Sequence, residues 1–277
     1  MQVQRHRVTL PVRSSLERHR GPQLAASRAW CRDNHSALAT HAIDERHAYA
    51  DSQRVSDRQA SSIDEPTEAL LRRYLDRLLE TNRSFNLTAI TDPDEAWSKH
   101  VLDSLTLLPD LRELVSGSRV VDVGSGGGLP GLPLAIVLPT LHFTLLEATG
   151  KKARFLAETA TALGLPNVTV VNDRAESFGH GSEREQFDAT TARAVSRLPV
   201  LLELTLPLIK VGGLSLSIKG EQAPREVEEA KNALLALQGH VESTRRTSTG
   251  VVVRVRKLAA TPPKYPRQAG ERKRVPV

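Results

Sequence analysis

From residue 119 onward, short apolar runs alternate along the chain with longer segments in which apolar residues recur at helical spacing. The apolar runs predict strands near 119–123, 142–146, 168–172, 187–192, 214–218, 241–247 and 250–257. The segments between them predict helices near 130–138, 151–164, 198–209 and 224–238. This alternation favours a doubly wound α/β sheet of about seven strands, the last two forming a hairpin.

Two further helices are predicted ahead of the sheet. The first begins near Asp64 and carries an apolar face that includes Leu71, Tyr74 and Leu78. The second begins at Asp92, which can cap it, and continues to about Leu108. We therefore divide the chain into an N-terminal extension, N-terminal helices, a sheet domain and a basic tail, at residues 1–62, 63–116, 117–258 and 259–277.

The extension, residues 1–62, differs in composition from the rest of the chain. It holds five of the nine histidines and shows no apolar periodicity. Its start is rich in arginine and serine and poor in acids, which fits an organelle transit peptide, a disordered extension, or translation from too early a start. These alternatives stay open. The histidines have no regular spacing, so we expect no metal site.

The segment from Arg119 to Gly131 combines a buried strand, a glycine loop and the start of a helix. Glycines occupy positions 124, 126, 127 and 128. Because glycine has no Cβ, the backbone of such a loop can pass close to a ligand. A strand–loop–helix unit of this kind binds a cofactor at the carboxyl end of a parallel sheet.

Two classes of cofactor compete for this loop, because it also contains the dinucleotide pattern G-x-G-x-x-G. In a dinucleotide site the first glycine of the pattern directly follows the strand, but here that position is Gly124 and the pattern begins later. Asp122 at the loop entrance would repel a pyrophosphate but suits the ammonium group of S-adenosylmethionine. Glu147, after the second strand, can accept hydrogen bonds from ribose hydroxyls. This arrangement favours a class I methyltransferase with a Rossmann-like sheet over a dinucleotide enzyme.

Composition and charge narrow the class of protein further. A single cysteine, Cys31, excludes an internal disulfide and fits a reducing cytoplasm. No run approaches the roughly 18 apolar residues of a membrane span. We therefore expect a monomeric cytoplasmic protein that does not contact a membrane, although the extension leaves organelle targeting open.

The net charge of +6 is unevenly distributed. Residues 1–62 carry +4, residues 63–250 carry −5 and residues 251–277 carry +7. The basic end favours contacts with a phosphate backbone, and a solvated tail is the alternative of equal weight. Its candidate RNA-binding residues are Lys264, Arg267, Arg272, Lys273 and Arg274. Lys219, at the end of the fifth predicted strand, is a further RNA candidate or an ordinary strand-end lysine.

Several motifs together resemble one family of methyltransferases. They are Asn86-Leu-Thr-Ala-Ile90, His100-x-x-Asp103-Ser104, Asp122-Val-Gly-Ser-Gly-Gly-Gly-Leu-Pro-Gly131, Leu145-Leu-Glu-Ala-Thr-Gly-Lys-Lys152, Arg174-Ala-Glu176, Thr191-Ala-Arg193 and Lys264-Tyr-Pro-Arg267. In order and spacing they are similar to the bacterial small-subunit rRNA methyltransferase RsmG, also called glucose-inhibited division protein B. The resemblance covers about residues 66–277, and the first and last motifs are its most specific parts.

The resemblance implies transfer of a methyl group from S-adenosylmethionine to N7 of a guanosine in 16S rRNA of the small ribosomal subunit. It also implies the cofactor-binding residues. Gly124 and Leu129 would contact the cofactor in the first loop, Glu147, Ala148 and Thr149 would hold its ribose and adenosine edge, Ala175 and Glu176 would flank its adenine, and Arg193 would sit beside its methionine end. N7 carries no proton at neutral pH, so no catalytic base is expected.

The chain departs from the family pattern at two places. Residues 1–62 have no counterpart, and an arginine is expected near Gly250, where Thr249 precedes it. Arg245 or Arg246 could supply that function. His100 and Asp103 could meet on one helix, although a buried, hydrogen-bonded histidine is the simpler interpretation. Two other functions remain to be tested: a non-catalytic cofactor- or RNA-binding module, and a methyltransferase for small molecules or proteins.

Overall fold

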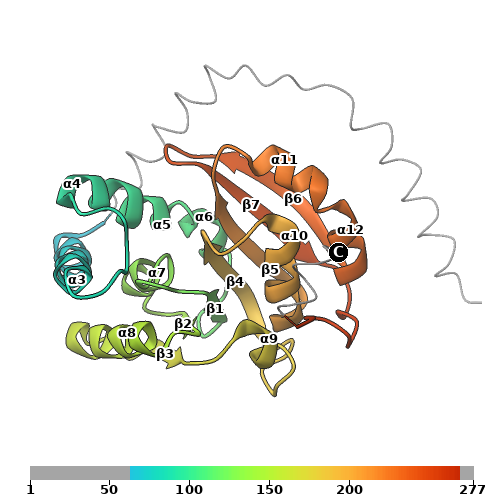
Figure 1. The fold of residues 1–277 in the computed structure, drawn as a ribbon, viewed down its shortest axis with the longest axis horizontal. Coiled ribbons are helices and arrows are strands. Elements are labelled where there is room, and N and C mark those ends of the chain that lie inside the picture. The colour runs from blue at the N-terminus through green and yellow to red at the C-terminus, as the bar shows by residue number, and fades with distance from the viewer. Residues whose placement is uncertain (1–62, 269–277) are drawn as a thin grey trace, which may run out of the picture. The chain divides into compact units, whose positions relative to one another are not determined.

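The computed structural model describes residues 63–268, which build a mixed seven-stranded sheet with helices on both faces (Figure 1). The strand order is β3-β2-β1-β4-β5-β7-β6. The strands are β1 (Arg119–Val123), β2 (His142–Leu146), β3 (Val168–Val171), β4 (Phe187–Arg193), β5 (Ile209–Lys219), β6 (Gly239–Arg246) and β7 (Val251–Lys257). The pairs from β3 to β5 are parallel, and β7 is antiparallel to both β5 and β6. The predicted doubly wound fold and its terminal hairpin are confirmed.

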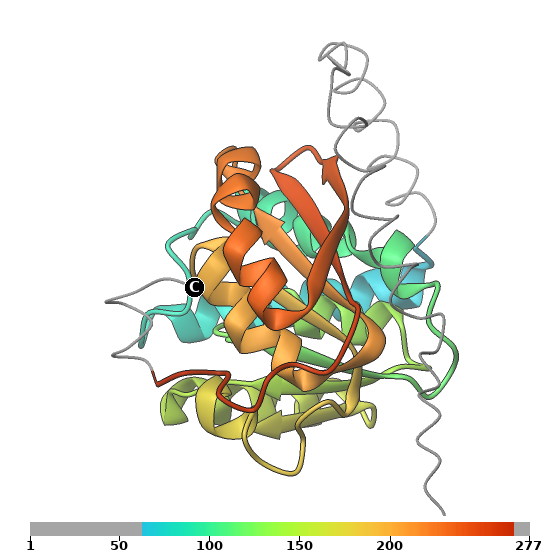
Figure 2. The same ribbon diagram turned by 90° about the vertical axis from the view of Figure 1, so that its right-hand side faces the viewer.

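Helices cover the two faces of the sheet unequally (Figures 1 and 2). One face carries α3 (Glu65–Asn82), α4 (Pro93–Ala96), η1 (Trp97–Leu102), α5 (Asp103–Leu105), α6 (Leu108–Leu111), α7 (Gly131–Val137) and α8 (Gly150–Leu163). The other face carries α9 (Ala175–Phe178), α10 (Leu198–Thr205), η2 (Leu206–Leu208), α11 (Ala223–Glu229) and α12 (Lys231–Leu237). The chain therefore changes face between β1 and β4, which is where ligands bind in sheets of this type.

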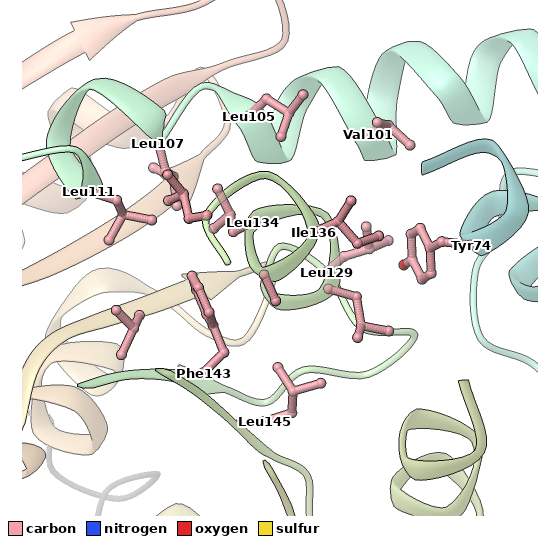
Figure 3. Close-up of a cluster of buried hydrophobic side chains, with 14 of the residues drawn as sticks. Tyr74, Val101, Leu105, Leu107, Leu111, Leu129, Leu134, Ile136, Phe143 and Leu145 are labelled. Carbon is pink, nitrogen blue, oxygen red and sulfur yellow. The ribbon is translucent and has the colours of Figure 1, made fainter. Parts of the chain in front are cut away.

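Strand β1 shows why the sheet is buried on both faces. Val120 belongs to the apolar core beneath α7, whereas Val121 and Val123 belong to the core on the opposite face. Side chains alternate along a strand, so a strand covered on both faces needs apolar residues at nearly every position. Figure 3 shows the larger core, in which side chains of the N-terminal helices pack against α7 and β2. Its labelled members are Tyr74, Val101, Leu105, Leu107, Leu111, Leu129, Leu134, Ile136, Phe143 and Leu145.

The N-terminal helices share this core with the sheet, and one of them is irregular. The single helix expected from Asp92 to Leu108 is divided into α4, the π-helix η1, α5 and α6. Asp92 caps it as predicted, accepting a hydrogen bond from the amide of Glu95. A π-helix is rare and often marks a functional position. Here it carries His100, whose side chain is buried.

Three other elements differ from the sequence prediction. Strand β5 begins at Ile209, five residues earlier than expected, because Gly212 adopts a φ of +86° and lets the strand continue through a change in register. The helix predicted over 224–238 is two helices that meet at Ala230. Helix α9, at four residues, is too short to give a periodic pattern.

The segment after β7 folds back onto α9 and α10. Tyr265 and Pro266 are buried, and the guanidinium of Arg184 donates hydrogen bonds to four backbone carbonyls, among them those of Thr261 and Tyr265. Arg267 forms an ion pair with the fully buried Glu203 of α10, with Nη2 lying 2.8 Å from Oε2. The structure therefore gives Arg267, expected from the sequence to contact phosphate, an internal partner in Glu203. Lys264 is exposed, and Arg272, Lys273 and Arg274 lie outside the described residues.

We expect Arg267→Ala to lower the free energy of unfolding by about 3 kcal/mol, because it leaves a buried carboxylate without its charged partner. Urea unfolding followed by circular dichroism measures this change. Lys264→Ala is the matched control, since Lys264 is exposed in the same motif and its loss should change stability by less than about 0.5 kcal/mol. Equal stability of the two variants would contradict the internal role of Arg267.

Candidate functional site

A pocket of about 300 Å³ opens at the carboxyl ends of β1, β2 and β4, where the chain changes face. We call it the cofactor pocket. Its walls are largely apolar, with acidic residues among them. It is lined by Val123, Gly124, Leu146, Ala148, Asp173, Arg174, Ala175, Glu176, Val195, Ser196, Val200 and Leu204. Four residues predicted from the sequence, Gly124, Ala148, Ala175 and Glu176, therefore line a single pocket.

The glycine loop forms one edge of this pocket. Gly124 has a φ of +73°, and a Cβ there would lie 3.0 Å from a methyl of Val195. Gly127 lies under helix α3, where a Cβ would come within 2.8 Å of Leu78, and its carbonyl accepts a hydrogen bond of 2.9 Å from the buried hydroxyl of Tyr74. Side chains at these positions would displace the loop. The glycines thus let the loop fit between the pocket and the N-terminal helix.

Asp122 lies beneath the loop, not at its mouth. Its side chain is fully buried and accepts hydrogen bonds from the amide of Gly131 at 3.2 Å and the hydroxyl of Thr191 at 3.0 Å. Burial raises the pKa of Asp122 to about 6, although these hydrogen bonds act in the opposite direction. The structure therefore places Asp122 as a tie between β1, the start of α7 and β4, and not among the residues that line the pocket.

Glu147 supports the loop from the end of β2. Its two carboxylate oxygens accept hydrogen bonds from the amide of Gly126 at 2.9 Å and from the amide of Thr149 at 2.7 Å. Each carboxylate oxygen has a second lone pair, so these bonds leave acceptor capacity for a ligand hydroxyl. The expected role of Thr149 is thus partly internal, since its amide fixes the carboxylate.

Two other predicted cofactor residues, Glu176 and Leu129, lie in different surroundings. Glu176 is buried at the edge of the pocket and forms an ion pair of 3.2 Å with Arg174. Leu129 does not line the pocket; it is buried in the core beneath α7, as Figure 3 shows. Leu129 therefore holds the loop in place from inside.

These features fit S-adenosylmethionine. The glycine loop leaves space that a Cβ would fill, the apolar walls suit an adenine ring, and the carboxylate of Glu176 suits an amino donor. Glu147 and Thr149 are not among the residues that line the pocket; Glu147 holds the adjoining loop at Gly126. No group of three or more acids, histidines or cysteines within residues 63–268 is placed to hold a metal ion. No helix in that range is long and apolar enough to cross a membrane.

A second pocket, of about 470 Å³, adjoins the first and shares Val195 and Ser196 with it. We call it the acceptor pocket. It opens between the ends of β4 and β5. It is lined by Asp103, Arg193, Ala194, Val195, Ser196, Arg197, Ile218, Lys219, Gly220, Glu226 and Thr249. Ala194 has a φ of +54°, a conformation that costs energy for a residue with a Cβ.

Arg193 joins three of the sequence motifs at this second pocket. Its guanidinium donates hydrogen bonds to the carbonyl of Lys99 at 2.7 Å, to Asp103 at 3.1 Å and to Nδ1 of His100 at 3.1 Å. Nε2 of His100 lies 2.6 Å from the hydroxyl of Thr88, in the Asn86-Leu-Thr box. Asp103 also accepts a short hydrogen bond from Thr249. Arg193 therefore lines the acceptor pocket and not the cofactor pocket.

Burial, followed by the charge of Arg193, lowers the pKa of His100. Its Nδ1 lies 3.1 Å from both Nη2 of Arg193 and the carbonyl of Lys99, and its Nε2 lies 2.6 Å from the hydroxyl of Thr88. The simpler sequence interpretation, a buried and hydrogen-bonded histidine, describes this residue. His100 and Asp103 meet through Arg193, not directly.

Residues 67–254 match the family model described as rRNA small subunit methyltransferase G. The chain belongs to this family. The ribosomal RNA small subunit methyltransferase G of Sorangium cellulosum is 51% identical over 205 residues, covering 74% of this chain and 86% of that protein. The protein of the same name from Lactobacillus johnsonii is 43% identical over 212 residues, covering 74% and 89%. A solved methyltransferase from Aquifex aeolicus, titled as SAM dependent, aligns with a TM-score of 0.46 at 19% identity over 59% of this chain and 93% of that chain.

As a member of the rRNA small subunit methyltransferase G family, the chain is an rRNA methyltransferase that uses S-adenosylmethionine. The predicted resemblance, enzyme class and cofactor are confirmed. The roles of individual residues remain predictions, because they rest on the geometry of this chain alone.

Lys219 occupies a position that the sequence left undecided. Its side chain is buried, forms an ion pair of 2.7 Å with Glu226 and donates a hydrogen bond of 2.6 Å to the carbonyl of Ser196. It therefore lines the acceptor pocket without reaching out toward a phosphate. Arg245, one of the two residues that could replace the arginine expected near Gly250, forms an ion pair with Asp110.

Sequence reasoning missed Tyr74, Glu226 and Thr249 as parts of the site. Tyr74 reads as one more apolar position of α3, because only the structure shows its hydroxyl at the glycine loop. Glu226 lies in a segment with several other glutamates, and no pattern separates it from them. Thr249 stands where the sequence departs from the family pattern, and that departure could have identified it as a residue of the site.

We expect Asp122→Asn to remove a pH-dependent part of the stability. The folded-state pKa of about 6 lies above the usual aspartate value of 3.8, so the folded protein binds more protons between these values and loses stability as the pH rises through them. The two values differ by about two pH units, which corresponds to a loss of about 3 kcal/mol between pH 4 and pH 6. Thermal or urea unfolding of both proteins from pH 4 to 7 measures it; parallel profiles would contradict the assignment.

Proposed function

We propose that this protein transfers a methyl group from S-adenosylmethionine to N7 of a guanosine in 16S rRNA. The observation that carries the proposal is the pair of adjoining pockets, which share Val195 and Ser196 at the ends of β1, β4 and β5. One suits the methyl donor and the other has room for an acceptor base. The family match over residues 67–254 supports rRNA as the substrate.

The chemistry asks little acid–base work of the protein. Guanine N7 has a free lone pair and no proton at neutral pH, so it can attack without a general base. Bound S-adenosylmethionine supplies a methyl group on a positively charged sulfur. Alignment of two reactants in neighbouring pockets can contribute about 7–11 kcal/mol in favourable cases. The residues of both pockets therefore act by holding and orienting their ligands.

Several residues around the cofactor pocket have distinct proposed roles. Glu147 accepts hydrogen bonds from the ribose and fixes the loop amide of Gly126. Ala148, Ala175 and Glu176 bound the adenine, with Glu176 near its amino group. Arg193 holds η1 against the end of β4 and keeps its positive charge on protein acceptors. These contacts of Arg193 matter because the methylated base becomes a cation, and a nearby guanidinium without acceptors would disfavour it.

Contacts with the RNA backbone are assigned to the basic end of the chain. Residues 63–250 carry a net charge of −5, which does not attract a polyanion. Lys264 is exposed, and Arg272, Lys273 and Arg274 follow it in the sequence. Arg267 is left out of this set because of its ion pair with Glu203. We propose that the protein acts as a monomer in the cytoplasm, where small ribosomal subunits are found.

Methyl transfer from labelled cofactor tests the proposal. Small subunits, free 16S rRNA and protein fractions would be offered separately, and the labelled nucleoside identified by chromatography. Label recovered as 7-methylguanosine at one position of 16S rRNA is the expected result. Label in protein or in a small molecule would favour another methyltransferase, and cofactor binding without transfer would favour a non-catalytic module.

We expect Glu147→Ala to weaken S-adenosylmethionine binding about 10- to 100-fold, because it removes charge-assisted hydrogen bonds to the ligand and to the loop. Calorimetry measures the affinity. Glu158→Ala is a suitable control, since Glu158 is an exposed acid on the following helix, α8. Equal affinities for the two variants would remove Glu147 from the cofactor site.

Truncation after Gln268 should weaken binding to rRNA and leave cofactor affinity unchanged. It removes Arg272, Lys273 and Arg274 but keeps the Arg267–Glu203 ion pair. Each lost phosphate contact should reduce the salt slope of binding by about 0.7 on single strands. RNA affinity at two or more salt concentrations measures this slope, and an unchanged slope would exclude the tail from the RNA site.

A further inference from the structure

Glu226 is a carboxylate in the acceptor pocket that has one oxygen available for a ligand. Its side chain is 13% exposed, on the short helix α11. Oε2 forms an ion pair with Nζ of Lys219 and accepts a hydrogen bond from the amide of Leu198, each at 2.7 Å. No hydrogen bond reaches Oε1 from any donor in residues 63–268. The carboxylate is thus fixed by one oxygen while the other remains an unused acceptor in the described chain.

The other charged groups of the acceptor pocket already have partners. Both carboxylate oxygens of Asp103 accept hydrogen bonds, one from Arg193 and one from Thr249. Arg193 is held by three acceptors, and Lys219 by Glu226 and a carbonyl. A ligand that enters the pocket therefore meets its unused charged acceptor at Glu226.

The acceptor pocket lies where a substrate base would have to be. It adjoins the cofactor pocket along Val195 and Ser196, so a planar base inside it can face the methyl donor across a short distance. Its volume of about 470 Å³ falls in the range of small-ligand sites. A base inside a stacked duplex could not enter it, so the nucleotide must be unstacked or turned outward.

We propose that Oε1 of Glu226 recognises the target guanine by accepting hydrogen bonds from its 2-amino group and N1–H. This inference rests on the proposed function of the two pockets. Guanine places these two donors on its Watson–Crick edge, whereas adenine has an acceptor at N1 and lacks the 2-amino group. When that edge faces Glu226, N7 on the opposite side of the purine remains open to the neighbouring pocket. The carboxylate therefore selects guanine and orients N7 for attack.

The same contact favours the reaction itself. As the bond from N7 to the methyl carbon forms and the carbon–sulfur bond breaks, the positive charge moves from sulfur to the purine. No proton is released in this step. A fixed anion on the Watson–Crick edge stabilises the cation more strongly than the neutral base, and this difference accelerates the transfer.

The test pairs a change in the protein with a change in the RNA. Small subunits are reconstituted with 16S rRNA that carries either guanosine or inosine at the methylated position, since inosine lacks only the 2-amino group. Single-turnover methyl transfer is measured for the wild type and for Glu226→Gln. Loss of a charge-assisted hydrogen bond should slow the wild type on inosine, and the variant on guanosine, by about 10- to 100-fold each.

The decisive measurement is the rate of the Glu226→Gln variant on subunits that carry inosine. If Glu226 contacts the 2-amino group, the variant should lose less on inosine than on guanosine, because inosine lacks one of the two donors and keeps only N1–H. Cofactor affinity by calorimetry should be unchanged in Glu226→Gln. Glu228→Gln is the matched control on the same helix, since Glu228 is exposed and pairs with Lys231; it should retain wild-type rates on both substrates.

Three outcomes would overturn the inference: equal wild-type rates on guanosine and inosine, multiplicative losses in the combination, or loss of cofactor affinity in Glu226→Gln. The first is measured on the wild-type protein and so does not depend on whether the variant folds. Failure of the proposed function is distinguishable, because then the wild type would form no 7-methylguanosine in subunits that carry the natural guanosine.

Discussion

The glycine loop after β1 is the element on which the two pockets depend. The amides of Gly124 and Ser125 bond the carbonyl of Leu146 at the end of β2, and side chains fix the loop further from three sides. Tyr74 reaches it from the N-terminal helix, Glu147 from the end of β2, and Asp122 ties the start of the following helix to β1 and β4. Small residues at the contact points allow these approaches. The N-terminal helices are therefore part of the cofactor site through packing, although none of their residues lines it.

The second pocket follows from a related constraint, the docking of η1 against the end of β4. Arg193 links a carbonyl, an imidazole and a carboxylate of the N-terminal helices. Thr88 and Thr249 extend the cluster to the loop before the helix and to the final hairpin. Four segments distant in sequence are thus held together by polar contacts. Because these groups are largely buried, each has few other hydrogen-bond partners available. This explains why short motifs scattered along the chain occur together.

The sheet could be predicted from sequence because buried parallel strands give mainly apolar runs, as in Val120–Val123 of β1, where Asp122 is the one polar residue among three valines. The glycine loop and Glu147 could be placed because their spacing relative to strands has a physical reason. Helix breaks at η1 and Ala230 could not, since propensity does not change there and packing decides. Side-chain direction was the larger limit. Asp122 and Arg267 carry the charges expected for ligand contacts, yet both point inward, toward Thr191 and Glu203.

The fold of the C-terminal segment ties the residues after β7 to the cofactor pocket. Glu203 is fully buried on α10, the helix whose residues Val200 and Leu204 form one wall of that pocket. Its partner, Arg267, follows the final strand and lies 64 residues further along the chain. The carboxylate inside α10 therefore depends on a charge that neither the sheet nor its helices supply. A change at Arg267 can thus reach the wall of the cofactor pocket through Glu203 without touching the ligand.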